Sequence, residues 1–188
     1  MPVSSEAPPR VLVVVPARYG SQRFPGKPLA PIRGRDGVAR PLIQWSWEAA
    51  MQLADRAEVI VATDDPHIAD VVRGFGGTVA MTPDTARNGT ERCAALLDQC
   101  DSAPDLVINL QGDSPLVTRA ALEALIDGWA ATRAPVLTPW LACDATIGAM
   151  LLADDRAGRV GGTSVVADRA GNALYFSKRP IPYGPGEG

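Results

Sequence analysis

Short apolar runs recur along the first part of the chain, and the first of them is the most continuous. Val11 to Val15 are five consecutive apolar β-formers, a pattern typical of a strand that is buried on both faces. Three further runs have the length of a strand: Val59 to Ala62, Thr78 to Met81 and Leu106 to Leu110. Strands of this kind favour a parallel sheet that is covered by helices.

Segments with apolar residues at helical spacing separate these runs. The first opens at Pro41, and the second follows Asp65-Pro66, an aspartate and proline pair that signals a helix start. Asn88 to Cys100 is predicted to be the third helix, and Thr118 is expected to cap the fourth. The alternation of strand and helix predicts an α/β fold.

The pattern changes toward the end of the chain. Val136 to Leu141 is expected to be one more strand, and Thr163 to Ala167 and Ala173 to Phe176 are short β runs. The polar stretch Asp168 to Asn172 joins the last two, which indicates an antiparallel hairpin. Residues 1–10 are expected to form a flexible tail and residues 11–188 a single domain, which ends in a proline- and glycine-rich stretch.

Composition narrows the classes of function. The three cysteines lack the close spacing of a zinc or redox motif, which favours reduced, buried thiols. His67 is the only histidine, so multi-histidine metal sites are excluded, and it is expected to be a solvated residue of a first helical turn. Residues 1–10 show neither an apolar run nor a basic start, so a cytoplasmic protein without a membrane partner is predicted.

Charge is distributed unevenly along the chain. The formal net charge is −3, yet the segment from Arg18 to Arg40 contains six lysines and arginines and one aspartate, a local net charge of +5. A focused cationic patch on an acidic body suits a small anionic ligand better than a nucleic acid.

The cationic segment begins directly after the first predicted strand. Pro16 ends that strand, and Arg18, Arg23 and Lys27 follow in a loop rich in glycine and proline. Because ligands of open α/β sheets bind outside the carboxyl ends of the strands, this loop is placed to hold an anion such as a polyphosphate. Its glycine spacing does not match a Walker A or GxGxxG motif, and a solvated surface turn is the alternative.

Further polar groups are expected at the same edge of the sheet. Asp113 follows the run Leu106 to Leu110, where its carboxylate could hold Mg²⁺ together with substrate phosphates or could simply form a turn. Residues 88–92 open a helix whose amides could bind a nucleobase or a phosphate, although capping explains them equally well. Asp64-Asp65 could be a second metal pair, but the proline that follows favours N-capping.

The chain contains five motifs in a fixed order: PARYGSQRFPGKPL, VATDD, NGTER, NLQGDSPL and ALYFSKRPIPY. In this order and spacing they resemble the 3-deoxy-manno-octulosonate cytidylyltransferase (CMP-Kdo synthetase) family. The resemblance implies a Rossmann-like, three-layer nucleotidyltransferase fold with a mostly parallel sheet and a C-terminal antiparallel hairpin. It also implies CTP and Mg²⁺ as ligands, and an enzyme that activates a 2-keto sugar acid for lipopolysaccharide or capsule synthesis. A homodimer is expected if the family's C-terminal part is present.

The resemblance also implies roles for single residues. Lys27, Arg18 and Asp113 would be the catalytic residues, with the two cations on the phosphates and Asp113 on the magnesium ion. The nucleotide would also lie near the Ala17 backbone, Thr90, Glu91, Arg92 and Gln111. Gln111 would lie by the nucleotide or the sugar. Independently of the resemblance, Lys178 follows the last predicted strand and could bind an anionic second substrate such as a sugar acid, although a lysine at a strand end is more often only solvated. The anomeric hydroxyl would attack the α-phosphate of CTP and release pyrophosphate.

Three features depart from the family pattern. Ser114 stands where the family more usually has a glutamate, which removes a carboxylate close to the expected metal and allows a different metal geometry or affinity. Lys178 stands where the family commonly has an arginine, which allows a sugar acid other than Kdo. Family members continue for several dozen residues, so the domain is expected to be C-terminally incomplete. Two alternatives remain: a CTP-binding module without transferase activity, and a glycosyltransferase that uses a nucleotide sugar. The absence of an Asp-X-Asp motif near Asp113 disfavours the second.

Overall fold

The structure is a computed structural model that describes residues 8–20 and 24–181. Three of the predictions therefore fall outside the described residues in whole or in part: the N-terminal tail over residues 1–7, the cation Arg23, and the proline- and glycine-rich end over residues 182–188.

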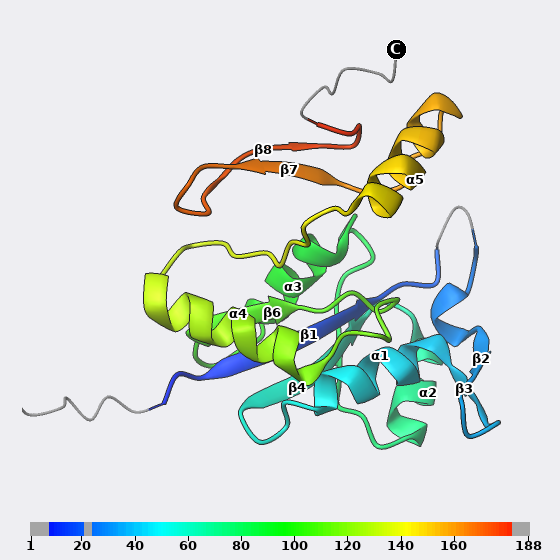
Figure 1. Ribbon diagram of the computed structural model, residues 1–188. Helices are drawn as coiled ribbons and strands as arrows, with labels where there is room; N and C mark the ends of the chain where they lie inside the picture. Colours follow the sequence, from blue (N-terminus) through cyan, green and yellow to red (C-terminus); the bar gives the residue numbers. More distant parts are fainter. Residues whose placement is uncertain (1–7, 21–23, 182–188) are drawn as a thin grey trace, which may run out of the picture. The chain divides into compact units, whose positions relative to one another are not determined.

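A four-stranded parallel sheet with the strand order β5-β4-β1-β6 forms the centre of the first part of the chain (Figure 1). β1 (Val11–Ala17) pairs with β4 (Ala57–Thr63) along its whole length, and β6 (Leu106–Asn109) lies on its other side. β5 (Val79–Met81) extends the sheet beyond β4. The strand order reverses between β1 and β6, which is the switch point where ligands bind in open α/β sheets.

Helices cover both faces of this sheet (Figure 1). Three helices contribute side chains to the core on one face: α1 (Leu42–Met51), α2 (Pro66–Gly74) and α4 (Arg119–Thr132). α3 (Gly89–Leu97) covers the other face. The α/β fold with three layers that the sequence predicted is confirmed.

Both faces of β1 are buried, as its unbroken apolar run predicted, but the prediction that Pro16 ends the strand is wrong, because Pro16 and Ala17 still pair with β4. Val13 and Val15 belong to the larger core, which includes Ile43 of α1. Leu12 and Val14 point to the opposite side and belong to a smaller core with Leu96 of α3. Since side chains alternate between the two faces of a strand, a central strand buried on both faces needs apolar residues at every position.

The helices begin where the sequence predicted. Asp65 accepts a hydrogen bond from the amide of Ile68 (3.0 Å) at the start of α2, and Thr118 accepts one from the amide of Ala121 (3.3 Å) at the start of α4. Each cap satisfies one of the amides that a helix N-terminus leaves without a partner. His67, in the first turn of α2, has an 84% exposed side chain, which confirms its prediction as a solvated residue.

The predicted strand from Val136 to Leu141 is wrong, because the structure has no strand there. Val136 and Leu141 are 83% and 85% exposed, and Pro139 between them has no amide hydrogen to donate to a ladder. The sequence pattern also missed two small elements. One is the hairpin of β2 (Pro31–Arg33) and β3 (Ala39–Pro41), and the other is α5 (Ala145–Arg156).

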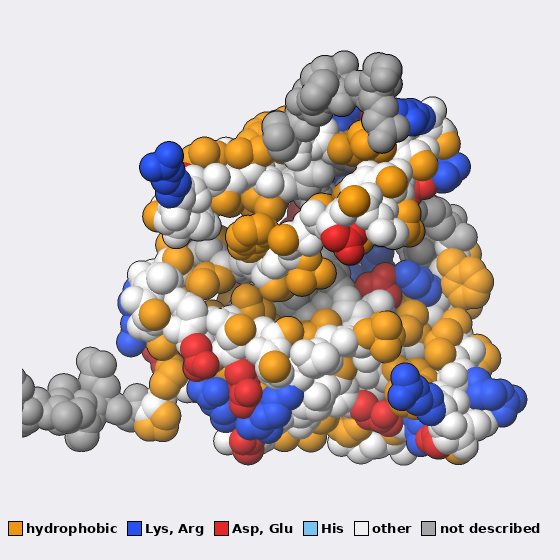
Figure 2. Space-filling model, in the orientation of Figure 1, with side chains coloured by type: hydrophobic (Ala, Val, Ile, Leu, Met, Phe, Trp, Pro, Cys, Tyr) orange, Lys and Arg blue, Asp and Glu red, His pale blue; other side chains and the backbone are white. Residues whose placement is uncertain are grey.

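The chain divides into two compact units, Met1–Leu137 and Thr138–Gly188. In the second unit, β7 (Ser164–Ala167) and β8 (Ala173–Ser177) form the predicted antiparallel hairpin, which confirms that part of the fold. Figure 2 shows apolar side chains on the visible surface of this hairpin and of α5. The single domain over residues 11–188 stays a prediction.

The three cysteines are free thiols in different environments. Cys93 is buried, Cys100 is half-buried and Cys143 is exposed, so the prediction of buried thiols is right for Cys93 and wrong for Cys143. Within residues 8–20 and 24–181, none of the helices is both long enough and apolar enough to cross a membrane.

Candidate functional site

A cleft of about 590 Å³ opens in the first unit, at the carboxyl ends of β1 and β6. Three segments line it: the loop after β1, the start of α3, and the turn after β6. Its charged lining, among the described residues, consists of four cations and one carboxylate: Arg18, Lys27, Arg87, Arg92 and Asp113. This excess of positive charge suits a small, multiply charged anion.

Lys27 and Asp113 contact each other in this cleft. The Nζ atom of Lys27 donates to Oδ2 of Asp113 at 2.6 Å, although 86 positions separate the two residues in the sequence. Their side chains are 44% and 49% exposed, so both groups stay accessible to a ligand. The structure therefore brings together the cationic loop after the first strand and the acid after the fourth, as the sequence predicted.

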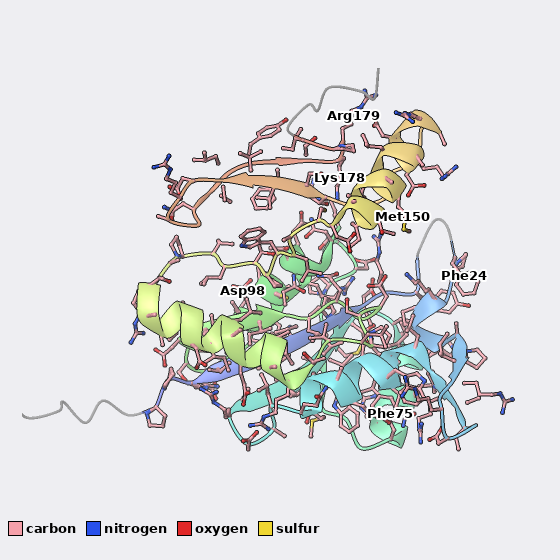
Figure 3. The ribbon with its side chains drawn as sticks, in the orientation of Figure 1. Phe24, Phe75, Asp98, Met150, Lys178 and Arg179 are labelled. Atoms are coloured by element: carbon pink, nitrogen blue, oxygen red, sulfur yellow. The ribbon has the colours of Figure 1, made fainter. Side chains whose placement is uncertain are left out.

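The backbone of the cationic loop fixes the position of Lys27. Gly26 has a φ of 70°, and its amide donates to the carbonyl of Tyr19 at 2.9 Å. A side chain at this position would be strained by the left-handed backbone and would lie 3.1 Å from the Tyr19 ring. Lys27 then opens the short helix η1 (Lys27–Leu29), where Pro28 is buried. Phe24, labelled in Figure 3, precedes this turn and lines the cleft.

The turn that carries Asp113 is packed tightly against the end of β1. A Cβ atom on Gly112 would lie 2.6 Å from the carbonyl oxygen of Pro16, closer than real Cβ atoms approach a backbone oxygen. From the other side, the buried hydroxyl of Ser46 in α1 donates to the carbonyl of Gly112 at 2.9 Å. Gly112 and Ser46 together set the position of Asp113, a role that the sequence pattern did not indicate for either residue.

Arg18 and Gln111 lie where the sequence placed them, at the ends of β1 and β6. Arg18 follows the buried Ala17, and its Nη1 donates to the carbonyl of Arg87 at 3.1 Å. This bond connects the loop after β1 with the segment before α3. Gln111 lines the cleft, and its Nε2 donates to Oδ1 of Asn109 at 2.8 Å.

The three predicted residues at the start of α3 have different surroundings. Glu91 accepts hydrogen bonds from the Arg87 amide (2.9 Å) and from Nδ2 of Asn88 (3.0 Å), and it pairs with the Arg87 guanidinium at 2.8 Å. The bond from the Arg87 side chain is the main reason that the pKa of Glu91 is lowered. Arg92 lines the cleft. Thr90 and Glu91 are not among the described residues that line it. The Glu91 carboxylate therefore binds groups at the N-terminus of α3, and its amide donates to the cap residue Asn88, in agreement with the capping alternative.

Arg92 is buried beside the cleft and is held from two sides. Its Nη2 lies 3.3 Å from Oδ2 of Asp64, and its Nη1 donates to the hydroxyl of Thr82 at 2.6 Å. Asp65 caps α2, so the adjacent Asp64 is left to pair with the arginine. The sequence favoured N-capping over a metal pair at these two aspartates. The cap made by Asp65 and the ion pair made by Asp64 agree with that prediction. The sequence did not indicate the partnership of Asp64 with Arg92.

Lys178 lies in the second unit, directly after β8, and is labelled in Figure 3. Its Nζ donates to the hydroxyl of Thr163 at 2.6 Å within that unit. The predicted role of Lys178 in binding a sugar acid stays a prediction.

The residues of the cleft fit a magnesium ion only together with a ligand. Within the described ranges, no group of three histidine, cysteine or acidic side chains could hold a metal by itself. Asp113 offers one hard carboxylate on the wall of a cationic cleft. Mg²⁺ typically binds in this way, through one or two carboxylates with substrate phosphates and water in the remaining positions.

Comparison with known proteins identifies the family. The family model described as "Cytidylyltransferase" matches residues 12–186. The chain belongs to the cytidylyltransferase family. The matched segment includes all the described residues that line the cleft, and it includes the β7–β8 hairpin.

Two curated relatives of the chain carry the same name. The chain is 43% identical over 173 residues to the 3-deoxy-manno-octulosonate cytidylyltransferase of Acaryochloris marina, covering 92% of this chain and 65% of that protein. It is 41% identical over 172 residues to the enzyme of the same name from Vibrio vulnificus, covering 91% and 63%. The solved structure of CMP:2-keto-3-deoxy-manno-octonic acid synthetase complexed with CTP matches at a TM-score of 0.77 and 39% identity, over 93% of this chain and 66% of that chain.

The chain thus spans about two thirds of the length of the proteins it matches. These matches cover both described units and confirm the family resemblance that the five motifs predicted.

Proposed function

We propose that this cytidylyltransferase moves CMP from CTP to the anomeric hydroxyl of a 2-keto sugar acid similar to Kdo and releases pyrophosphate. The contact between Lys27 and Asp113 in the cationic cleft carries the proposal. It brings a cation suited to phosphate and a carboxylate suited to a metal ion together at the switch point of the sheet. The similarity to CMP-Kdo synthetases supports CTP as the nucleotide and a Kdo-like acid as the acceptor.

In this proposal, the cations of the cleft bind the triphosphate. Lys27 and Arg18 lie on the same loop and contact the negatively charged phosphate oxygens, and the buried Arg92, paired with Asp64, presents a fixed guanidinium from the side of α3. Gln111 faces the cleft with an amide, which can donate to and accept from the base or the sugar. Such prearranged charge stabilises the additional negative charge of a phosphoryl-transfer transition state.

Asp113 is the residue that we propose for holding Mg²⁺, with phosphate oxygens as the other ligands. When bound there, the ion neutralises phosphate charge and polarises the phosphoryl group that is attacked. Lys27, Arg18 and Asp113 are thereby the residues proposed to contact the reacting groups.

The proposed reaction is a single displacement at phosphorus. The anomeric hydroxyl oxygen of the sugar acid forms a bond to the α-phosphorus of CTP, and the bond from this phosphorus to the α,β-bridging oxygen breaks. The hydroxyl proton is lost to solvent, and pyrophosphate leaves with the bridging oxygen. The role of the protein is to align attacking and leaving oxygens and to neutralise charge.

The wider setting follows from the family resemblance. We propose that the reaction takes place in the cytoplasm and supplies an activated sugar acid for lipopolysaccharide or capsule synthesis. We further propose that Lys178 pairs with the carboxylate of that acid, and that the complete protein is a homodimer.

Release of pyrophosphate tests the proposal. The protein is incubated with CTP, Mg²⁺ and Kdo, and pyrophosphate is measured with an enzyme-coupled assay while each component is omitted in turn. Release is expected only in the complete mixture, and Lys27→Ala and Asp113→Ala are each expected to lower kcat/KM by at least about 100-fold. Thermal stabilisation by CTP without pyrophosphate release would instead support a binding module. Full turnover in either variant would contradict the proposed site.

A further inference from the structure

The contact between Lys27 and Asp113 occupies the carboxylate to which the proposed function assigns a metal ion. The Lys27 ammonium lies 2.6 Å from Oδ2 of Asp113. A cation bound to this carboxylate would sit close to that ammonium, and two positive charges at such a distance repel each other strongly. Lys27 and a metal ion therefore compete for Asp113.

Neither partner can withdraw from this contact by moving its backbone freely. Gly26, with its left-handed φ of 70°, and the buried Pro28 fix the main chain on both sides of Lys27. Asp113 is held through Gly112, whose Cα has no space for a side chain beside the Pro16 carbonyl and whose own carbonyl accepts a hydrogen bond from Ser46. Relief of the competition therefore has to come from the Lys27 side chain, which is flexible and 44% exposed.

A triphosphate offers the Lys27 side chain another partner. The cleft that contains the pair is lined by three more cations, Arg18, Arg87 and Arg92, so a polyphosphate that binds there reaches Lys27. Once Lys27 contacts phosphate oxygens, Asp113 is released for the metal that the same phosphates bring. The metal and the nucleotide then bind as one unit, and each strengthens the binding of the other.

We propose that Lys27 is an internal counter-ion that suppresses metal binding at Asp113 until a metal–triphosphate complex enters the cleft. This inference rests on the proposed function. It adds that the free protein discriminates against the bare ion and selects the metal–nucleotide complex. The loss of Lys27 is expected to raise the affinity of the protein for the bare metal ion and to lower its affinity for the metal–nucleotide complex.

Titration with Mn²⁺ tests the inference, because electron paramagnetic resonance reports free Mn²⁺ without any need for turnover. In the absence of nucleotide, Lys27→Gln is expected to bind Mn²⁺ about fivefold more tightly than the unmodified protein, the size set by a half-exposed ion pair. With CTP present, the same variant is expected to bind the Mn²⁺–CTP complex at least about tenfold more weakly, since it lacks a cation on the phosphates.

Matched variants separate this effect from a general change in charge. Arg87→Gln removes one positive charge from the same cleft, but Arg87 pairs with Glu91 instead of Asp113, so a smaller gain in Mn²⁺ affinity is expected. Lys27→Arg keeps the charge and is expected to retain the low affinity for the bare ion. Asp113→Asn is expected to abolish the gain when it is combined with Lys27→Gln.

Each result has a defined meaning. Three results would overturn the inference. They are an unchanged Mn²⁺ affinity in Lys27→Gln, no detectable Mn²⁺ binding in any variant, and an equal gain in Mn²⁺ affinity in Arg87→Gln. Because the titrations with Mn²⁺ alone need no nucleotide, they fail independently of the proposed function. The latter fails if the unmodified protein does not bind CTP. Circular dichroism melting of each variant checks that the fold is intact, as expected for substitutions of half-exposed side chains.

Discussion

The guanidinium of Arg92 lies 3.3 Å from the carboxylate of Asp64, and the arginine side chain is only 3% exposed. A buried cation of this kind depends on its partner, because removal of the partner leaves a charge without compensation in a medium that solvates it poorly. The pair joins the end of β4 to α3, so it stabilises the fold at the edge of the proposed nucleotide cleft.

Asp64→Ala is therefore expected to lower the free energy of unfolding by about 3 kcal/mol, the typical cost of leaving a buried ion without its partner. Chemical denaturation with urea measures this value. Asp70→Ala is the matched control, because Asp70 and Arg73 form an exposed pair on the surface of α2, and a change below about 0.5 kcal/mol is expected there. An equally small change in Asp64→Ala would show that Arg92 does not rely on this carboxylate.

Gly112→Ala is expected to disturb the turn that carries Asp113, because the new Cβ would lie 2.6 Å from the Pro16 carbonyl oxygen. Overpacking against backbone typically costs about 1–3 kcal/mol, and the shifted turn should also weaken CTP binding. Thermal melting with and without CTP measures both effects. Gly74→Ala is the control, since a Cβ atom there meets nothing within 4 Å. CTP affinity that is unchanged in Gly112→Ala would mean that the turn tolerates the displacement.

The Arg87–Glu91 contact predicts a pH dependence. The pKa of Glu91 is lowered from the ordinary value of 4.5, mainly by the hydrogen bond from the Arg87 side chain. A carboxyl whose pKa is lower in the folded protein stabilises the fold above its unfolded pKa, and this contribution is lost as the pH falls through the folded pKa. Removal of the carboxylate should therefore matter at neutral pH and cease to matter in acid.

Glu91→Gln is accordingly expected to lower the melting temperature at pH 7, and the difference from the unmodified protein should shrink at pH values below about 4.5. Differential scanning calorimetry between pH 3 and pH 7 provides the comparison. Glu58→Gln serves as the control, since Glu58 makes only a 3.9 Å surface contact with Arg10. A difference that does not vary with pH would show that the charge of Glu91 is not what stabilises this turn.

The cysteines should differ sharply in reactivity. Burial raises the pKa of the Cys93 thiol to about 11, so at pH 8 it is both protonated and inaccessible, whereas Cys143 is exposed. Reaction of the native protein with Ellman's reagent should show a fast phase from Cys143, and Cys93 should react only on unfolding. Cys143→Ser is expected to remove the fast phase. Rapid modification of Cys93 in that variant would contradict the packing of α3 on the sheet.

Much of the first unit could be predicted because its signals are local. The apolar run Val11 to Val15 requires burial on both faces, and the Asp65-Pro66 pair marks the start of α2. Both signals can be recognised without knowing which distant residues they contact. The convergence of Lys27 and Asp113 followed from one general rule, that the carboxyl ends of parallel strands share an edge.

Other features depend on partners distant in the sequence, which local patterns do not reveal. Val136 to Leu141 has the composition of a strand, yet a strand exists only where a neighbour offers a hydrogen-bond ladder. Asp64 and Ser46 likewise became informative only when the fold brought them to Arg92 and Gly112. Ser46 is a polar residue inside an apolar pattern, and Asp64 stands in the polar run Thr63 to Asp65, but neither pattern identified the partner.

Two glycines of the cleft leave no space for a side chain beside Pro16, since a Cβ atom on Gly112 would meet its carbonyl oxygen at 2.6 Å and a Cβ atom on Gly89 would meet its ring at 3.0 Å. One glycine belongs to the turn after β6 and the other is the first residue of α3. A larger residue at either position would therefore crowd the end of β1 as well as the ligand. A redesign of the pocket for a bulkier nucleotide would have to keep both positions as glycine.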